Sequence, residues 1–138
     1  MNANPISLIY VAGCIHVGII AANIPLPGLL KVRKRLAGVE GFVRQIFYVH
    51  WLYIVLVLAL FAALCFGFPV ELAGASRLGR FFSGFMACFW VLRIGLQWLY
   101  YDRKLRREYA ILDWPYAIAL ILLSSIFVHA ALFPVRQM

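Results

Sequence analysis

Acidic residues are scarce in this chain of 138 residues, and none lies inside its long hydrophobic runs. Only five Asp and Glu stand against 13 Lys and Arg, a formal net charge of +8. Basic side chains do enter the four runs: His16, His50, Arg93 and His129 each lie in a different one, and Arg80 lies near the start of the third. An ionisable group in a bilayer is costly and usually faces a bundle interior, a cavity or a ligand. The lack of nearby carboxylates therefore predicts that an anion reaches these cations from elsewhere.

Cysteines and catalytic motifs are also sparse. Cys14, Cys65 and Cys88 lie in different runs and form no close pair, so we interpret them as small apolar packing residues. This excludes disulfide-generating chemistry that needs paired thiols. A Gly-rich phosphate loop, a nucleophile elbow and a His-Glu zinc motif are all missing, which excludes the enzyme classes that those motifs define.

Hydrophobic residues dominate what is present. They make up 65% of the chain, and the mean hydropathy of +0.92 is far above that of soluble proteins. Crossing about 30 Å of hydrocarbon takes about 20 helical residues, and residues 5–30, 47–68, 78–100 and 114–135 are long enough. Backbone groups in lipid need internal partners, so these spans must be helices. We predict one all-α domain over residues 1–138, a four-helix transmembrane bundle in the bacterial inner (plasma) membrane, with an uncleaved first span.

The charges predict the orientation of this bundle. Three basic residues, Arg77, Arg80 and Arg136, fall on one side. Nine fall in the two loops on the other side: Lys31, Arg33, Lys34, Arg35, Arg44, Arg103, Lys104, Arg106 and Arg107. Basic loops stay cytoplasmic, so both termini should be extracytoplasmic. The positive charge is thus explained by membrane orientation, and we do not expect nucleic-acid binding.

The first basic loop has an amphipathic pattern of its own. Its apolar residues repeat at helical spacing among the basic ones, at Val32, Leu36, Val39, Val43 and Ile46. Such a segment is suited to an anionic cytoplasmic leaflet. We therefore predict an interfacial segment here, interrupted by Gly38 and Gly41, which weaken a continuous helix.

Helical rise places two histidines at one depth. Counted from the cytoplasmic ends, His16 lies at about 18 Å and His129 at about 21 Å. Two imidazoles on different helices can be the axial ligands of a b-type haem iron. Arg93, roughly 6–9 Å below by the same count, is placed to hold a haem propionate. The simpler interpretation gives each histidine a hydrogen bond between helices, and pairs Arg93 with lipid phosphate or Asp102.

A lower polar layer is predicted nearer the cytoplasm. Asn23, His50, Arg93 and Gln97 fall within it, and they can hold an anionic headgroup or a quinone. Tyr53 and His50 are candidates to donate to a quinone carbonyl, and Trp90, near Arg93, to contact the ligand.

Three functions follow from these patterns. The leading hypothesis is a haem-b electron-transfer subunit that serves a quinone together with other membrane or redox subunits. The first alternative is a membrane protein that binds or modifies an anionic lipid or small-molecule headgroup through the lower polar layer. The second is a non-catalytic accessory subunit of a larger membrane complex.

Overall fold

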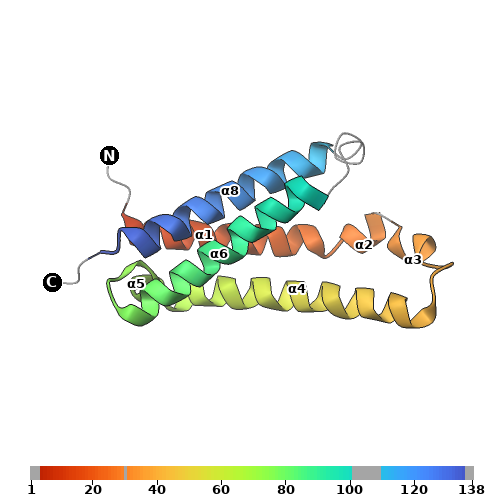
Figure 1. The fold of residues 1–138 in the computed structure, drawn as a ribbon, viewed down its shortest axis with the longest axis horizontal. Coiled ribbons are helices and arrows are strands. Elements are labelled where there is room, and N and C mark those ends of the chain that lie inside the picture. Colours follow the sequence, from red (N-terminus) through yellow and green to blue (C-terminus); the bar gives the residue numbers. More distant parts are fainter. Residues whose placement is uncertain (1–3, 30, 101–109, 136–138) are drawn as a thin grey trace.

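The structure is a computed structural model that describes residues 4–29, 31–100 and 110–135. Four long helices and three short ones account for most of this part of the chain (Figure 1). The long helices are α1 (Pro5–Asn23), α4 (Gly41–Gly67), α6 (Arg77–Tyr100) and α8 (Ala110–Leu132). The short helices are α2 (Leu26–Leu29), α3 (Val32–Arg35) and α5 (Pro69–Ala73).

Each long helix belongs to a segment apolar and long enough to cross a membrane. These segments are Pro5–Leu29, Gly41–Gly67, Arg77–Tyr100 and Asp113–Leu132. The prediction of an all-α protein with four candidate membrane spans is therefore confirmed, and the lengths indicate an integral membrane protein. The orientation stays a prediction. The second basic loop falls within residues 101–109, so it and Asp102 lie outside the described residues.

Two helices begin earlier than the hydrophobic runs predicted. α4 begins at Gly41, ahead of residue 47, because the apolar repeat of the first loop joins the second span without a helix breaker. The interfacial segment is consequently divided between α3 and the first turns of α4. α8 begins at Ala110, ahead of residue 114, so Asp113 lies inside the helix.

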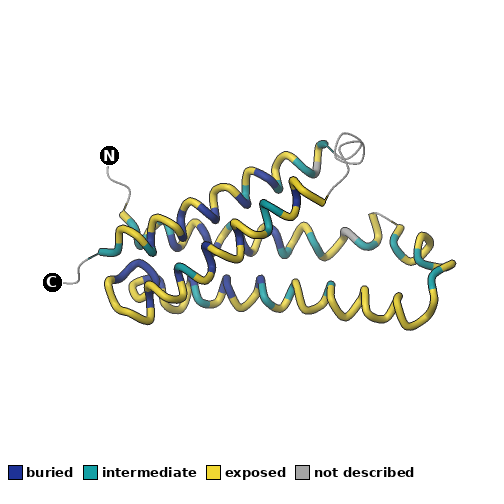
Figure 2. Tube along the Cα trace, viewed as in Figure 1, coloured by how far each residue is buried: buried dark blue, intermediate teal, exposed yellow. Residues whose placement is uncertain are grey.

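The bundle is closed at one end and open at the other. α6 packs against α8 and α1 against α4, while α1 also contacts α8 and α5. The two pairs diverge toward the end that carries α2 and α3 (Figure 1). Figure 2 shows buried residues gathered near the termini and α5, whereas the first half of α4 is almost wholly exposed. Any buried site must therefore form at the closed end.

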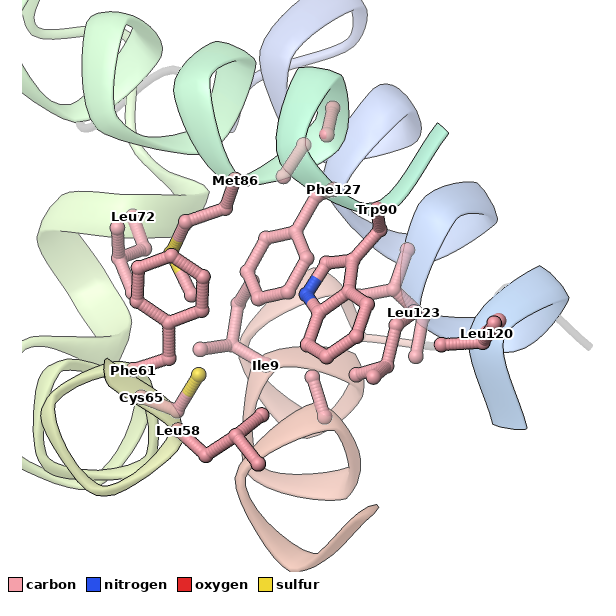
Figure 3. Packing of buried hydrophobic residues seen from close by; sticks show 14 of the residues in the cluster. Ile9, Leu58, Phe61, Cys65, Leu72, Met86, Trp90, Leu120, Leu123 and Phe127 are labelled. Atoms are coloured by element: carbon pink, nitrogen blue, oxygen red, sulfur yellow. The ribbon is translucent and has the colours of Figure 1, made fainter. Parts of the chain in front are cut away.

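Large apolar side chains from all four long helices fill that closed end (Figure 3). On α8 they recur at helical spacing, as at Leu120, Leu123 and Phe127, so one face of the helix is buried. The other labelled members of the cluster are Ile9 of α1, Leu58, Phe61 and Cys65 of α4, Leu72 of α5, and Met86 and Trp90 of α6.

The short helix α5 covers the closed end. Its buried Leu72 carbonyl accepts a hydrogen bond of 2.7 Å from the Ser83 hydroxyl of α6. The Ala73 carbonyl accepts one of 2.8 Å from the Val135 amide, which ties the chain's last described residues to α5. These bonds satisfy backbone carbonyls at a helix end that would otherwise be buried without partners.

Candidate functional site

His16 lies at the centre of the closed end and is fully buried, with 0% of its surface exposed. Its Nδ1–H donates to the Ala12 carbonyl at 2.6 Å, since a carbonyl oxygen can only accept. The rings of Trp90, Phe61 and Phe127 surround the imidazole at centroid distances of 5.3, 5.7 and 6.0 Å. Nε2 has no hydrogen-bond partner in the part of the chain that the structure describes.

His129 does not join His16. It is exposed, and its nearest ring is that of Phe133 on its own segment, at 5.5 Å. The residue of α8 that faces His16 is Phe127, and side chains two residues apart on a helix point about 200° apart. His129 therefore lies on the outer face of the bundle. Although the two histidines were predicted at a similar depth, their side chains do not point into the same part of the bundle.

The residues present do not fit a haem held between these two histidines of one chain. Aromatic rings pack closely around the His16 imidazole, where a macrocycle would need a flat space. Among residues 4–29, 31–100 and 110–135, no group of three or more His, Cys, Asp or Glu is placed to hold a metal ion. Haem binding thus remains a prediction from sequence, without support from the packing.

Arg93 finds partners within the α6–α8 hairpin. Its guanidinium carbon lies 5.4 Å from the centroid of the Tyr116 ring, a cation–π geometry. One turn further along α6, the Gln97 amide donates to the Asp113 carboxylate at 2.8 Å. Because α8 starts early, Asp113 comes within a turn of Tyr116. The same hairpin thus holds an aromatic partner for Arg93 and a carboxylate bonded one turn away to Gln97, and an anion from outside the chain stays a prediction.

The remaining members of the lower layer stay apart. Asn23 donates to the Ile19 carbonyl of its own helix at 2.8 Å. His50 likewise donates to the Ile46 carbonyl at 3.0 Å, and both His50 and Tyr53 are exposed on α4. Since the helix pairs diverge at this end, α1 and α4 do not bring these residues into one layer with Arg93 and Gln97. Trp90 instead belongs to the buried surroundings of His16.

A basic concavity lies at the open end of the molecule. Its volume is about 500 Å³, and its lining is Pro27, Gly28, Lys31, Arg33, Lys34, Ala37 and Arg44, which we call the basic cradle. Four of its seven residues are cationic. None of the four has an acidic partner among the described residues. The cradle is therefore a concentration of positive charge that no acidic side chain among the described residues neutralises.

An unusual backbone conformation at Lys31 shapes the cradle. Its φ of 50° and ψ of 39° are left-handed, which non-glycine residues seldom adopt. The Lys31 amide donates to the Gly28 carbonyl, and its own carbonyl accepts from the Lys34 and Arg35 amides, each at 3.0 Å. These bonds form a turn at the start of α3. The cradle was not predicted because this turn does not follow from residue type, although the dense basic run after two prolines was a usable signal.

A smaller concavity of about 400 Å³ lies at the closed end. It is lined by Arg77, Arg80, Phe81, Ala131 and Leu132. Arg80 already donates through Nε to the Ala131 carbonyl at 3.2 Å, so one of the two cations of this concavity is engaged within the chain.

Comparison of the chain with protein-family models, with curated proteins and with solved structures gives no match. The function must accordingly be argued from the geometry alone.

Proposed function

We propose that this integral membrane protein binds the headgroup of an anionic phospholipid in the basic cradle. The observation that carries the proposal is the set of four cations around one concavity without acidic partners among the described residues. A buried or clustered positive charge is stabilised by an anion that approaches from outside. Phosphate oxygens suit both the point charge of lysine and the planar fork of arginine.

The position of the cradle in the chain supports a lipid as the ligand. It follows the end of α1 and includes the first turns of α4, so it lies where two candidate spans leave the apolar layer. Leu29, Phe42 and Val43, beside it in the sequence, are exposed. Exposed apolar side chains next to a basic concavity can contact acyl chains while the cations contact the headgroup. On the predicted orientation, this is the anionic cytoplasmic leaflet.

The charges set the size of the expected effect. Each Lys or Arg near an anionic membrane surface contributes about 1 kcal/mol. Removing two of the four cations should therefore weaken lipid binding by about 2 kcal/mol, roughly a 30-fold increase in Kd. The double variant Lys31→Gln/Arg44→Gln removes one cation from each side of α3 and keeps side chains of similar length.

Lipid binding can be measured in phosphatidylcholine nanodiscs. Phosphatidylglycerol is titrated in, and the lipids retained by the protein are counted by native mass spectrometry. We expect selective retention of phosphatidylglycerol that Lys31→Gln/Arg44→Gln reduces by about 30-fold in affinity. The matched control, Arg77→Gln/Arg80→Gln, removes two cations from the other concavity and should leave retention unchanged. Equal losses in both variants would mean a general charge effect and would refute a specific cradle.

A further inference from the structure

Two complementary polar atoms inside the closed end have no hydrogen-bond partner among the residues that the structure describes. They are Nε2 of His16 and Nε1 of Trp90, in side chains that are 0% and 1% exposed. The two ring centroids lie 5.3 Å apart, with the planes inclined at 61°. Figure 3 shows the indole nitrogen of Trp90 facing the interior of the cluster. Buried polar atoms are nearly always paired, with protein or with a bound molecule, so this pair calls for an occupant.

The hydrogen-bonding roles of the two atoms define that occupant. Because Nδ1 of His16 donates to Ala12, the neutral imidazole leaves Nε2 as an acceptor. The indole N–H of Trp90 can only donate. A hydroxyl satisfies both at once, since its oxygen accepts from the indole and its hydrogen donates to the imidazole. A carboxylate or a ketone carbonyl cannot donate, and an ammonium group cannot accept.

We infer that His16 and Trp90 form a binding site for one hydroxyl group, carried by water or by a phenol-type ring from the bilayer. A ring that carries the hydroxyl would pack against Phe61 and Phe127, which also contact the imidazole. The site is separate from the basic cradle, which lies at the opposite end of the bundle. The inference therefore stands or falls independently of lipid binding.

The proposed route from the bilayer to this site lies between α4 and α6. These helices make little backbone contact, and aromatic side chains close the space between them. Phe61 of α4 meets Phe85 and Phe89 of α6 at 6.4 and 5.1 Å, and Phe89 meets Trp90 at 5.1 Å. Phe85 is 54% exposed and Phe89 is 36% exposed on the outer surface. Rotation of side chains alone can therefore admit a ligand from lipid, without movement of a helix.

The indole proton of Trp90 provides a direct readout. Protein labelled with 15N-tryptophan should give four indole resonances, one for each Trp, and Trp90→Phe identifies the one that belongs to the site. The probe is 4-hexylphenol, with hexylbenzene as the matched compound without a hydroxyl. We expect the phenol to shift the Trp90 resonance and to bind about tenfold more tightly than hexylbenzene. Trp90→Phe, followed through the ligand's own line width, should reduce the preference for the phenol, because only the bond to His16 Nε2 remains.

The source of the hydroxyl is decided in the same experiment. A cross-peak between the Trp90 indole proton and a long-lived water, unaffected by the phenol, identifies water as the occupant. Displacement of that water by the phenol identifies a ligand from the bilayer. His16→Leu should abolish either signal, with the indole resonances of Trp51, Trp98 and Trp114 as the check on folding. A Trp90 resonance with no bound water and no response to the phenol in the native protein would overturn the inference.

Discussion

Substitution of Gly79 by alanine should destabilise the closed end of the bundle. Gly79 lies in the first turn of α6, where its amide donates to the Ser76 hydroxyl at 3.0 Å. A Cβ atom at this position would overlap the carbonyl oxygen of Glu71 and lie 2.9 Å from the carbon of that carbonyl. Both atoms are backbone, so no side chain can rotate away. Either α5 or the start of α6 would have to move.

The structure allows the cost of that movement to be worked out. Overpacking of a well-packed contact typically costs about 1–3 kcal/mol. A shift of α5 would also stretch the hydrogen bond of 2.7 Å from Ser83 to Leu72, which is worth about 1 kcal/mol. The expected loss for Gly79→Ala is therefore about 2–4 kcal/mol. Gly84, in the same helix, has nothing within 4 Å of an added Cβ, and alanine there gains up to about 1 kcal/mol in helix propensity.

The two substitutions form a matched pair for one assay. Each variant is unfolded in mixed micelles with a rising fraction of dodecyl sulfate, and helix content is followed by circular dichroism. We expect the midpoint of Gly79→Ala to fall well below that of the native protein, and that of Gly84→Ala to be equal or higher. Equal midpoints for both variants would refute the contact between α5 and α6 as described.

The other predictions concern two further glycines, the Gln97–Asp113 hydrogen bond, the orientation in the membrane and the haem content. Gly13→Ala places Cβ 2.9 Å from the tip of the Phe66 ring, which can yield, and 3.1 Å from Cys65 Cβ, so it should cost about 1–3 kcal/mol, whereas Gly18→Ala should be neutral or stabilising, as at Gly84. Asp113→Ala removes the partner of the buried Gln97 amide and should lower the protein's free energy of unfolding in micelles by about 1–3 kcal/mol. A cysteine at Arg35 should react with an impermeant maleimide in inverted vesicles, and reaction from outside intact cells would reverse the assigned orientation. Protein purified from haem-replete cells should show no Soret band, and a stoichiometric band would mean that the histidines rearrange.

Much of the fold could be predicted because the bilayer constrains it through length and hydropathy. The four spans were found as runs of apolar residues, and the third matched closely, with 78–100 predicted and Arg77–Tyr100 observed. The first residue of a helix was predicted less accurately where an amphipathic stretch joins an apolar one, as at Gly41. Hydropathy averages over a window, so it does not register where a helix gains its first hydrogen-bonded turn.

The candidate sites were predicted far less well, because depth along a helix does not fix direction around it. His16 and His129 were placed at one level, yet one faces the core and the other the outside. Asn23 and His50 were assigned to a layer with Arg93, but the helix pairs diverge there and each side chain bonds to its own backbone. The basic cradle depends on one left-handed residue, Lys31, which its residue type would not indicate.

The sequence by itself indicated a membrane environment, an all-α fold and the number of candidate spans, because these properties depend on sums over many residues. Which side chains meet was decided only by the tertiary structure. Rotation of each helix about its axis and the divergence of the two pairs arise from packing, as at Phe61, Trp90 and Phe127 around His16. Aromatic volume at that one end sets how close the helices approach, and so decides which polar side chains are buried beside the rings, as His16 is.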